Sequence, residues 1–165
     1  MNKKNLHTVM FLLFVFAALA SSAPMQLVIS DFKANREISG PMLQQLRTMT
    51  KDLSSNLAQR SDLKVINEPN EKTAQLTGTL QEINMTTSMF KGAKYTAWNS
   101  KVTILVQIEL DIPQKQPVQN RFSIVKRLRS TEGEPQLDDK ICQELASQIV
   151  ARCSDEFNEM IQETH

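Results

Sequence analysis

The segment KVTILVQIELDI, residues 101–112, alternates apolar and polar side chains more regularly than any other part of the chain. Its apolar positions are Val102, Ile104, Val106, Ile108, Leu110 and Ile112. Because successive side chains of a strand point to opposite faces, the alternation predicts a strand with one buried and one solvated face. A sheet of this kind needs other elements to cover its apolar face.

One further strand is predicted before this strand in the chain, and one after it. After the polar turn Pro113–Asn120, the segment Arg121–Ser130 (RFSIVKRLRS) is expected to return antiparallel to it. Before it, Thr73–Asn84 (TAQLTGTLQEIN) alternates in the same way. A tight turn at Lys91–Lys94 would make Thr73–Ile112 one long hairpin with a protruding tip.

The amino-terminal part predicts a strand, a helix and a second strand. The short apolar runs Gln26–Phe32 (QLVISDF) and Leu63–Ile66 are typical of buried strands. Between them a helix begins at Pro41, with Ser39 or Gly40 as its cap, and is expected to run to about Arg60. Its apolar residues recur at spacings of three and four, at Met42, Leu46, Met49, Leu53 and Leu57.

A second long helix is predicted at the carboxyl terminus. Its apolar stripe is Leu137, Ile141, Leu145, Ile149, Cys153, Phe157 and Met160. Asp138 and Asp139 fall in its first turn, where negative charge is favourable. The expected fold class is therefore α+β, with the order β-α-β-β-β-β-α. A mixed, largely antiparallel sheet would be packed by two long amphipathic helices.

Residues 1–20 have the pattern of a secretory signal peptide. Lys3 and Lys4 precede the apolar run Val9–Leu19, and Ala18-Leu19-Ala20 matches a cleavage site. Removing residues 1–20 from the chain of 165 leaves 145, residues 21–165, which suit a single periplasmic domain. Because Ser21 and Ser22 stand where a lipoprotein would have cysteine, no covalent lipid anchor is expected. Peripheral association with the outer membrane remains compatible with this interpretation.

The composition argues against catalysis, metal binding and nucleic-acid binding. His165, the last residue, is the only histidine after the predicted signal, which disfavours the usual catalytic triads and zinc sites. The four glycines are scattered and form no phosphate-binding loop, so no cofactor is expected. The formal charge of +1 becomes about −1 without Lys3 and Lys4, which is not the balance of a nucleic-acid binder.

Export would place Cys142 and Cys153 where disulfides can form. Eleven residues of continuous helix would separate their Cα atoms by roughly 16 Å, whereas a disulfide spans about 4.4–6.8 Å. Two buried free thiols are therefore favoured. A bridge across a broken helix or between chains, and a reactive thiol, stay open as alternatives.

Met85–Trp98 (MTTSMFKGAKYTAW) is the candidate partner-binding segment. Three of the six aromatic residues after the predicted signal lie here. The candidate residues are Phe90, Lys91, Lys94, Tyr95 and Trp98, because exposed aromatics with neighbouring lysines are typical of interaction hot spots. Alternatively the rings cap the core, since Trp98 has the same parity as Val102.

Basic residues concentrate on the last predicted strand, at Arg121, Lys126, Arg127 and Arg129. A solvated sheet face, or protection of an edge strand, is the favoured interpretation. An acidic partner or an anionic polymer is the alternative.

The order of these segments resembles an envelope superfamily that includes the curli secretion channel subunit (CsgG) and an outer-membrane activator of a penicillin-binding protein (LpoB). The resemblance rests on the strand Val28–Phe32 ending in Asp-Phe, on Leu63–Ile66, and on Ala74–Leu80 before the long hairpin. It implies a periplasmic or outer-membrane-associated domain that works through protein contacts. The hairpin arms beyond the core are expected to be short, which disfavours a channel.

The predicted function is therefore a non-catalytic envelope accessory domain whose partner is another envelope protein or a second copy of itself. An oligomeric subunit of an outer-membrane secretion or assembly complex is the alternative. A cell-wall hydrolase that uses carboxylates alone is the least favoured hypothesis.

Overall fold

The computed structural model describes residues 23–164, except residues 36–37, 39 and 94. The predicted signal peptide, residues 1–20, lies outside the described residues, as does Ser39. The elements in chain order are β1 (Met25–Ile29), β2 (Lys33–Ala34), α2 (Pro41–Leu57), β3 (Leu63–Val65), β4 (Ala74–Lys91), β5 (Thr96–Asp111), β6 (Val118–Ser130) and α3 (Asp139–Glu163). Apart from the two-residue β2, this is the predicted order.

The strands form one mixed sheet in the order β3-β1-β4-β5-β6. β1 is parallel to both β3 and β4, whereas β4, β5 and β6 are antiparallel neighbours. β2 adds a short parallel pair beside Thr79 and Leu80 of β4. The prediction of a mixed, largely antiparallel sheet is confirmed.

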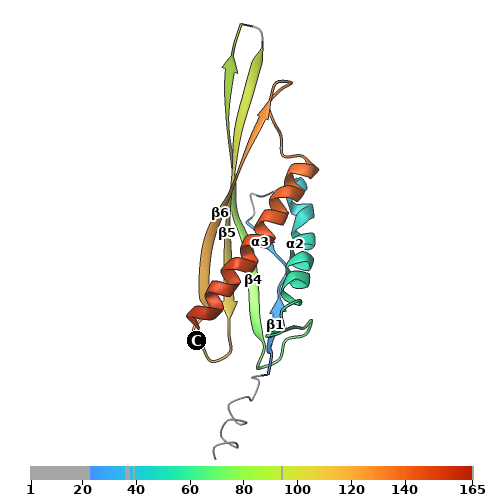
Figure 1. The fold of residues 1–165 in the computed structure, drawn as a ribbon, viewed down its shortest axis with the longest axis vertical. Coiled ribbons are helices and arrows are strands. Elements are labelled where there is room, and N and C mark those ends of the chain that lie inside the picture. The colour runs from blue at the N-terminus through green and yellow to red at the C-terminus, as the bar shows by residue number, and fades with distance from the viewer. Residues whose placement is uncertain (1–22, 36–37, 39, 94, 165) are drawn as a thin grey trace, which may run out of the picture.

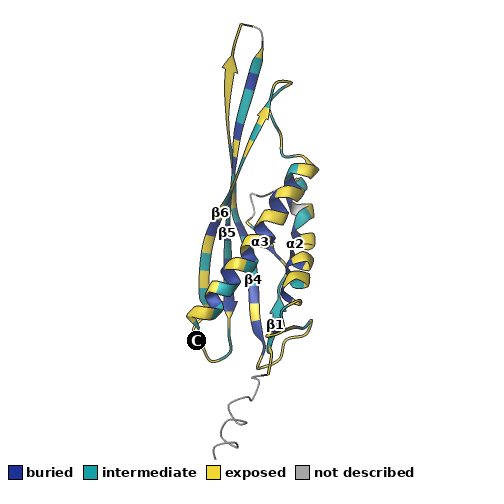
Figure 2. Ribbon diagram, in the orientation of Figure 1, coloured by how far each residue is buried: buried dark blue, intermediate teal, exposed yellow. Residues whose placement is uncertain are grey.

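Both long helices lie side by side on the same face of the sheet (Figure 1). Their apolar stripes meet the alternating apolar residues of β4 and β5 in one continuous core (Figure 2). Side chains without exposed surface in this core include Leu27, Met49, Leu80, Ile104, Ile108, Leu145, Ile149 and Phe157. The opposite face of the sheet is only partly buried, as the alternation in residues 101–112 predicts.

α2 begins as predicted but ends earlier. Gly40 is the N-cap residue with φ 74°, and Pro41 occupies the first turn. The helix ends at Leu57, its last apolar stripe residue, three residues before the predicted end at about Arg60. Arg60 instead pairs with Asp62 at 2.5 Å, and its guanidinium lies 5.8 Å from the centre of the Phe157 ring. The contact with the Phe157 ring and a hydrogen bond that Arg60 donates to Asn158 Oδ1 attach the loop after α2 to α3.

The first strand is shorter than the predicted segment Gln26–Phe32. β1 ends at Ile29, and Phe32 leaves the strand although its side chain stays buried. The Phe32 amide donates a hydrogen bond to Thr50 Oγ1 of α2 at 2.9 Å. This bond fixes the turn that carries the chain from the sheet to the helix layer.

A β-bulge allows β4 to extend well past its predicted end. The register to β5 shifts between Leu80 and Glu82, so the core-facing positions change from even to odd numbers. Ile83 and Met85 consequently remain on the helix side. β4 continues to Lys91, seven residues beyond the predicted end at Asn84.

Candidate functional site

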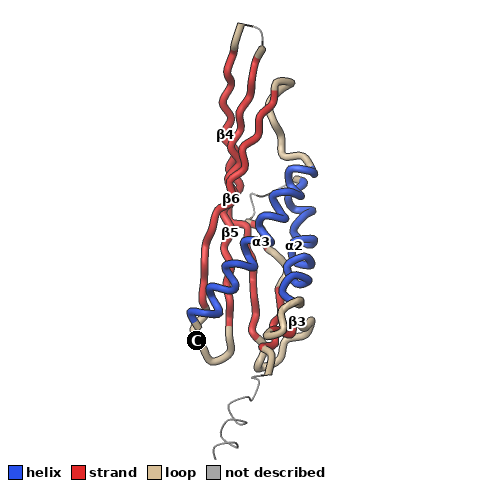
Figure 3. The backbone as a smooth tube through the Cα atoms, viewed as in Figure 1, coloured by secondary structure: helices blue, strands red, loops and turns tan. Residues whose placement is uncertain are grey.

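The distal parts of β4, β5 and β6 project beyond the helix layer (Figure 3). We call this region the arm and define it as Thr86–Lys91, Thr96–Lys101 and Arg127–Ser130. The arm is three-stranded near the helices, and only β4 and β5 continue past the pair Trp98–Ser130. The hairpin beyond the core is therefore longer than the sequence predicted.

Register assigns each arm residue to one of two faces. The helix-side face continues from Val102 through Ser100 and Trp98, which lie opposite Thr87 and Met89 on β4. Thr87 Oγ1 and Ser100 Oγ are hydrogen-bonded at 3.0 Å across this face. The open face, which carries no helix, includes Thr86, Ser88, Phe90, Asn99, Lys101, Arg127 and Arg129.

The tip of the arm is apolar and exposed. Met89, Phe90 and Tyr95 have relative exposures of 53%, 61% and 67%. They are three of the four exposed large apolar side chains in the described part of the chain. The turn itself is closed by a hydrogen bond from the Gly92 amide to the Tyr95 carbonyl oxygen at 2.9 Å.

The structure brings together only some of the predicted partner-binding residues. Phe90, Lys91 and Tyr95 are exposed at the tip, whereas Trp98 is half-buried on the helix-side face opposite Met89. Phe90 and Trp98 therefore lie on opposite faces of the arm. Lys94 lies outside the described residues. Sequence reasoning missed Met89, which is exposed because it lies on the part of β4 that extends beyond the helix layer.

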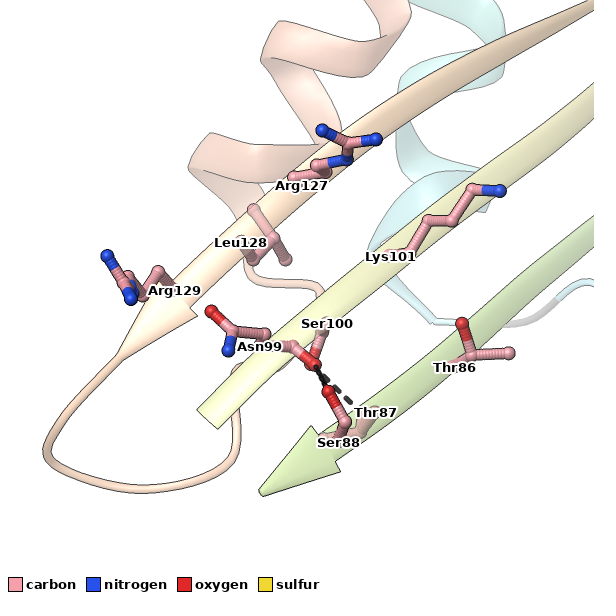
Figure 4. A pocket seen from close by; sticks show the side chains of 9 residues that line it. All are labelled: Thr86, Thr87, Ser88, Asn99, Ser100, Lys101, Arg127, Leu128 and Arg129. Atoms are coloured by element: carbon pink, nitrogen blue, oxygen red, sulfur yellow. Dashed lines mark hydrogen bonds between the residues drawn. The ribbon is translucent and has the colours of Figure 1, made fainter. Parts of the chain in front are cut away.

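The basic residues of β6 divide between the two faces. Lys126 lies on the helix side, where its ammonium contacts Glu144 of α3 at 2.5 Å and holds the pKa of that carboxyl below its ordinary value. Arg121, Arg127 and Arg129 lie on the open face. Arg127 and Arg129 line a hollow of about 450 Å³ together with Lys101 (Figure 4). Lys101 was not predicted because its position opposite Arg127 depends on strand register.

Cys142 and Cys153 are free and buried in one unbroken helix. Burial raises the pKa of both thiols, that of Cys153 to about 12. A thiol with so high a pKa is almost entirely protonated at neutral pH and is a poor nucleophile. These residues therefore belong to the packing between α3 and the sheet.

Metal-binding clusters and membrane-spanning helices were sought in the residues that the structure describes. No group of three or more His, Cys, Asp or Glu side chains there could hold a metal ion. No helix in the same residues is long and apolar enough to cross a membrane.

No family model and no curated protein matches this sequence. Among solved structures, rare lipoprotein B from Shewanella oneidensis is 14% identical, with a TM-score of 0.45, over 85% of this chain and 99% of that chain. A minor lipoprotein from Acinetobacter baumannii is 11% identical, with a TM-score of 0.45, over 81% and 95%. A DUF330 protein from Xanthomonas campestris is 10% identical, with a TM-score of 0.49, over 83% and 85%.

These comparisons correct one prediction. Rare lipoprotein B and the minor lipoprotein are by name lipoproteins, a class that carries covalent lipid, so the prediction that this chain has no covalent lipid anchor does not stand. Ser21 and Ser22, on which that prediction depended, lie outside the described residues. The narrower resemblance to the curli channel subunit and the penicillin-binding-protein activator stays a prediction.

Proposed function

We propose that this chain is a non-catalytic accessory protein of the bacterial cell envelope whose arm binds a protein partner. The observation that carries the proposal is the apolar tip, formed by Met89, Phe90 and Tyr95. Aromatic rings and methionine are the side chains that protein interfaces concentrate at their cores. The proposal includes the resemblance, drawn from the sequence, to the envelope superfamily of the curli channel subunit and the penicillin-binding-protein activator. That resemblance implies a domain that works through protein contacts.

The energetics of the tip support a binding role. Complete burial of one side chain of the size of Phe stabilises a structure by about 1.5–3 kcal/mol. Neither Phe90 nor Tyr95 contributes much of this to folding, since both are more than half exposed. The stabilisation is therefore available to a partner.

The edge of β4 offers a second kind of contact. From Glu82 to Lys91, β4 pairs with β5 on one side, and no described strand pairs with its other side. An open edge presents unpaired amide and carbonyl groups to which a partner can add a strand. The apolar tip and the open edge belong to the same segment, so one partner could contact both.

Site-specific photocrosslinking in the native envelope tests the proposal. A photoreactive phenylalanine analogue at Phe90 or Tyr95 is expected to capture one partner at defined stoichiometry. The matched control carries the same analogue at Gln116, which is exposed in the turn between β5 and β6 at the other end of the sheet. Equal capture from Gln116, or no capture from the tip, would contradict the proposal. Capture of a second copy alone would instead support the oligomeric alternative.

Direct binding measurements then quantify the contribution of the tip. Replacing Phe90 and Tyr95 together with Ser is expected to weaken partner recovery by a factor of about 100 or more, because two hot-spot residues are removed. The thermal midpoint should stay unchanged, since both side chains are exposed in the free protein. A loss of folding would show that the two rings belong to the core.

A further inference from the structure

The open face of the arm contains a hollow lined by three cations. Lys101 on β5 and Arg127 and Arg129 on β6 border it together with polar side chains of β4 and β5 (Figure 4). Its volume of about 450 Å³ falls in the range of small-ligand sites, about 300–1,000 Å³. The polar lining residues on the same face are Thr86, Ser88 and Asn99.

Strand register places the three basic residues at neighbouring positions of one face. Lys101 lies directly opposite Arg127, and Asn99 lies opposite Arg129. Directly opposed side chains on one face have Cβ atoms about 4.5–5.5 Å apart, and like charges in such pairs repel. The fold therefore places three basic side chains at neighbouring positions on the open face.

No acidic side chain compensates these charges within the described ranges. The ion pairs there join Arg60 with Asp62, Lys126 with Glu144, and Arg152 with Glu156. Lys126, the neighbour of Arg127 in sequence, is paired on the helix side, so the chain does pair a basic residue of β6 where that residue packs against a helix. By contrast, none of these ion pairs includes a basic residue of the open-face cluster.

We propose that this hollow binds the phosphate group of an anionic ligand. Three cations bordering one hollow match a terminal or monoester phosphate, which carries up to two negative charges and three free oxygens, better than a carboxylate with one charge. The two guanidinium groups can each donate paired hydrogen bonds to phosphate oxygens, and the hydroxyl of Thr86 can donate a further bond. An extended acidic peptide would need a longer basic strip, whereas Gln107 and Glu109 follow along the same face of β5.

Phosphate reaches this site either on a soluble molecule or in a lipid headgroup, and two probes distinguish them. Sodium pyrophosphate, titrated into the purified protein by calorimetry, tests the soluble source. Vesicles that contain phosphatidic acid, whose headgroup is a phosphate monoester, compared with vesicles of phosphatidylcholine alone, test the headgroup. Binding of pyrophosphate, or of phosphatidic acid vesicles alone, supports the proposal and names the source. Binding to neither probe overturns it.

Matched variants of β6 separate this site from general charge attraction. Arg127→Gln combined with Arg129→Gln should weaken binding at least about tenfold, because charge-assisted hydrogen bonds to the phosphate are lost. Lys126→Gln combined with Lys115→Gln removes the same charge from outside the hollow and should change affinity less than about twofold at 0.15 M salt. Equal loss in both double variants would overturn the proposal.

Thermal stability gives a readout that does not depend on a protein partner. Pyrophosphate should raise the midpoint of the wild-type protein and leave that of the Arg127→Gln, Arg129→Gln variant unchanged. Without ligand the variant should melt at the same temperature as the wild type or slightly higher, because a like-charge cross-strand pair has been removed. A variant that melts markedly lower would show a structural role for these arginines and contradict the proposal. Because the photocrosslinking experiment uses the tip, the two proposals can fail separately.

Discussion

Gly78 illustrates how one residue fixes the packing between sheet and helices. A Cβ atom at this position would overlap the Phe32 ring, which covers the strand at this point. The ring has little freedom to move, because Phe32 is buried and its amide is bonded to Thr50 Oγ1. Gly78 is thus required for close approach and not for backbone conformation.

Gly78→Ala is therefore expected to lower the free energy of unfolding by about 1–3 kcal/mol, the usual cost of overpacking a core. Urea denaturation measures this change. In the background of Phe32→Leu, which removes the ring, the same substitution should cost less than half as much. Equal costs in the two backgrounds would show that Phe32 is not the obstacle.

Cys153 makes stability depend on pH in the alkaline range. Burial, and then the nearby Glu156 carboxylate, raise its pKa from an ordinary 9.0 to about 12 in the folded protein. The folded state therefore keeps a proton that the unfolded state releases first. This contribution is complete below pH 9 and is lost as the pH rises from about 9 to about 12.

The free energy of unfolding should fall more steeply with pH for the wild type than for Cys153→Ala above pH 9. The difference in slope is at most about 1.4 kcal/mol per pH unit. Urea denaturation at pH 8, 9, 10 and 10.5 measures it, and other titrating groups cancel because both proteins contain them. Parallel curves would contradict the assigned burial of the thiol.

At the scale of elements, α3 begins at a well-defined cap. The Asp138 carboxylate accepts a hydrogen bond from the Ile141 amide at 2.8 Å, and Asp139 adds a negative charge to the first turn. This cap determines where the chain turns from β6 into the helix layer.

Asp138→Ala should destabilise the protein by about 1 kcal/mol, because an orphan amide of the first turn loses its acceptor. Asp138→Asn keeps a good capping side chain while removing the charge, and should cost much less. Thermal or urea denaturation compares the two variants. Equal destabilisation would mean that the charge, and not the cap, is the main contribution.

The elements differ in how well the sequence predicts them, for reasons of local chemistry. The long strand around Val106 and the helix stripe from Leu145 to Phe157 are set by repeating patterns, and both were predicted. β2 has only two residues and leaves no pattern. The continuation of β4 to Lys91 was missed because the bulge after Leu80 changes the parity of its apolar residues.

The arrangement of the candidate site depends more on how the strands pair than on the residue pattern of any one strand. Exposure of Phe90 and Tyr95 could be expected from their place in a turn, and the two arginines of the hollow were already visible on the last strand. That Lys101 faces Arg127, or that Trp98 turns away from Phe90, depends on the registers of two hairpins. Register is set by turn geometry and core packing together, so it cannot be deduced from the residue pattern of a single sequence.

At the scale of the whole molecule, the core and the arm are separate parts of one sheet. Every member of the continuous buried core lies outside residues 87–100, although Ala97 and Ser100 are locally buried within the arm. The helices, which cover the proximal half of the sheet, therefore stabilise a platform from which the arm extends (Figure 3). Binding surfaces on the arm can then change without changing the fold.

Truncation of the arm tests this separation directly. Replacing residues 87–100 with Asn-Gly joins Thr86 to Lys101, which are already paired, through a two-residue turn favoured in hairpins. The free energy of unfolding should change by less than about 2 kcal/mol, because the core stays complete and the shorter loop costs less entropy to close. Urea denaturation with a single cooperative transition would show this.

The truncated protein should at the same time lose partner capture, since the apolar tip is absent. A matched variant that keeps the full-length arm but carries Phe90→Ser and Tyr95→Ser should lose partner capture to the same extent. If the truncated protein does not fold, the arm is part of the cooperative unit, and its exposed apolar residues would then need a structural explanation. If the protein folds and still captures the partner, the binding surface lies on the helices or on the proximal sheet.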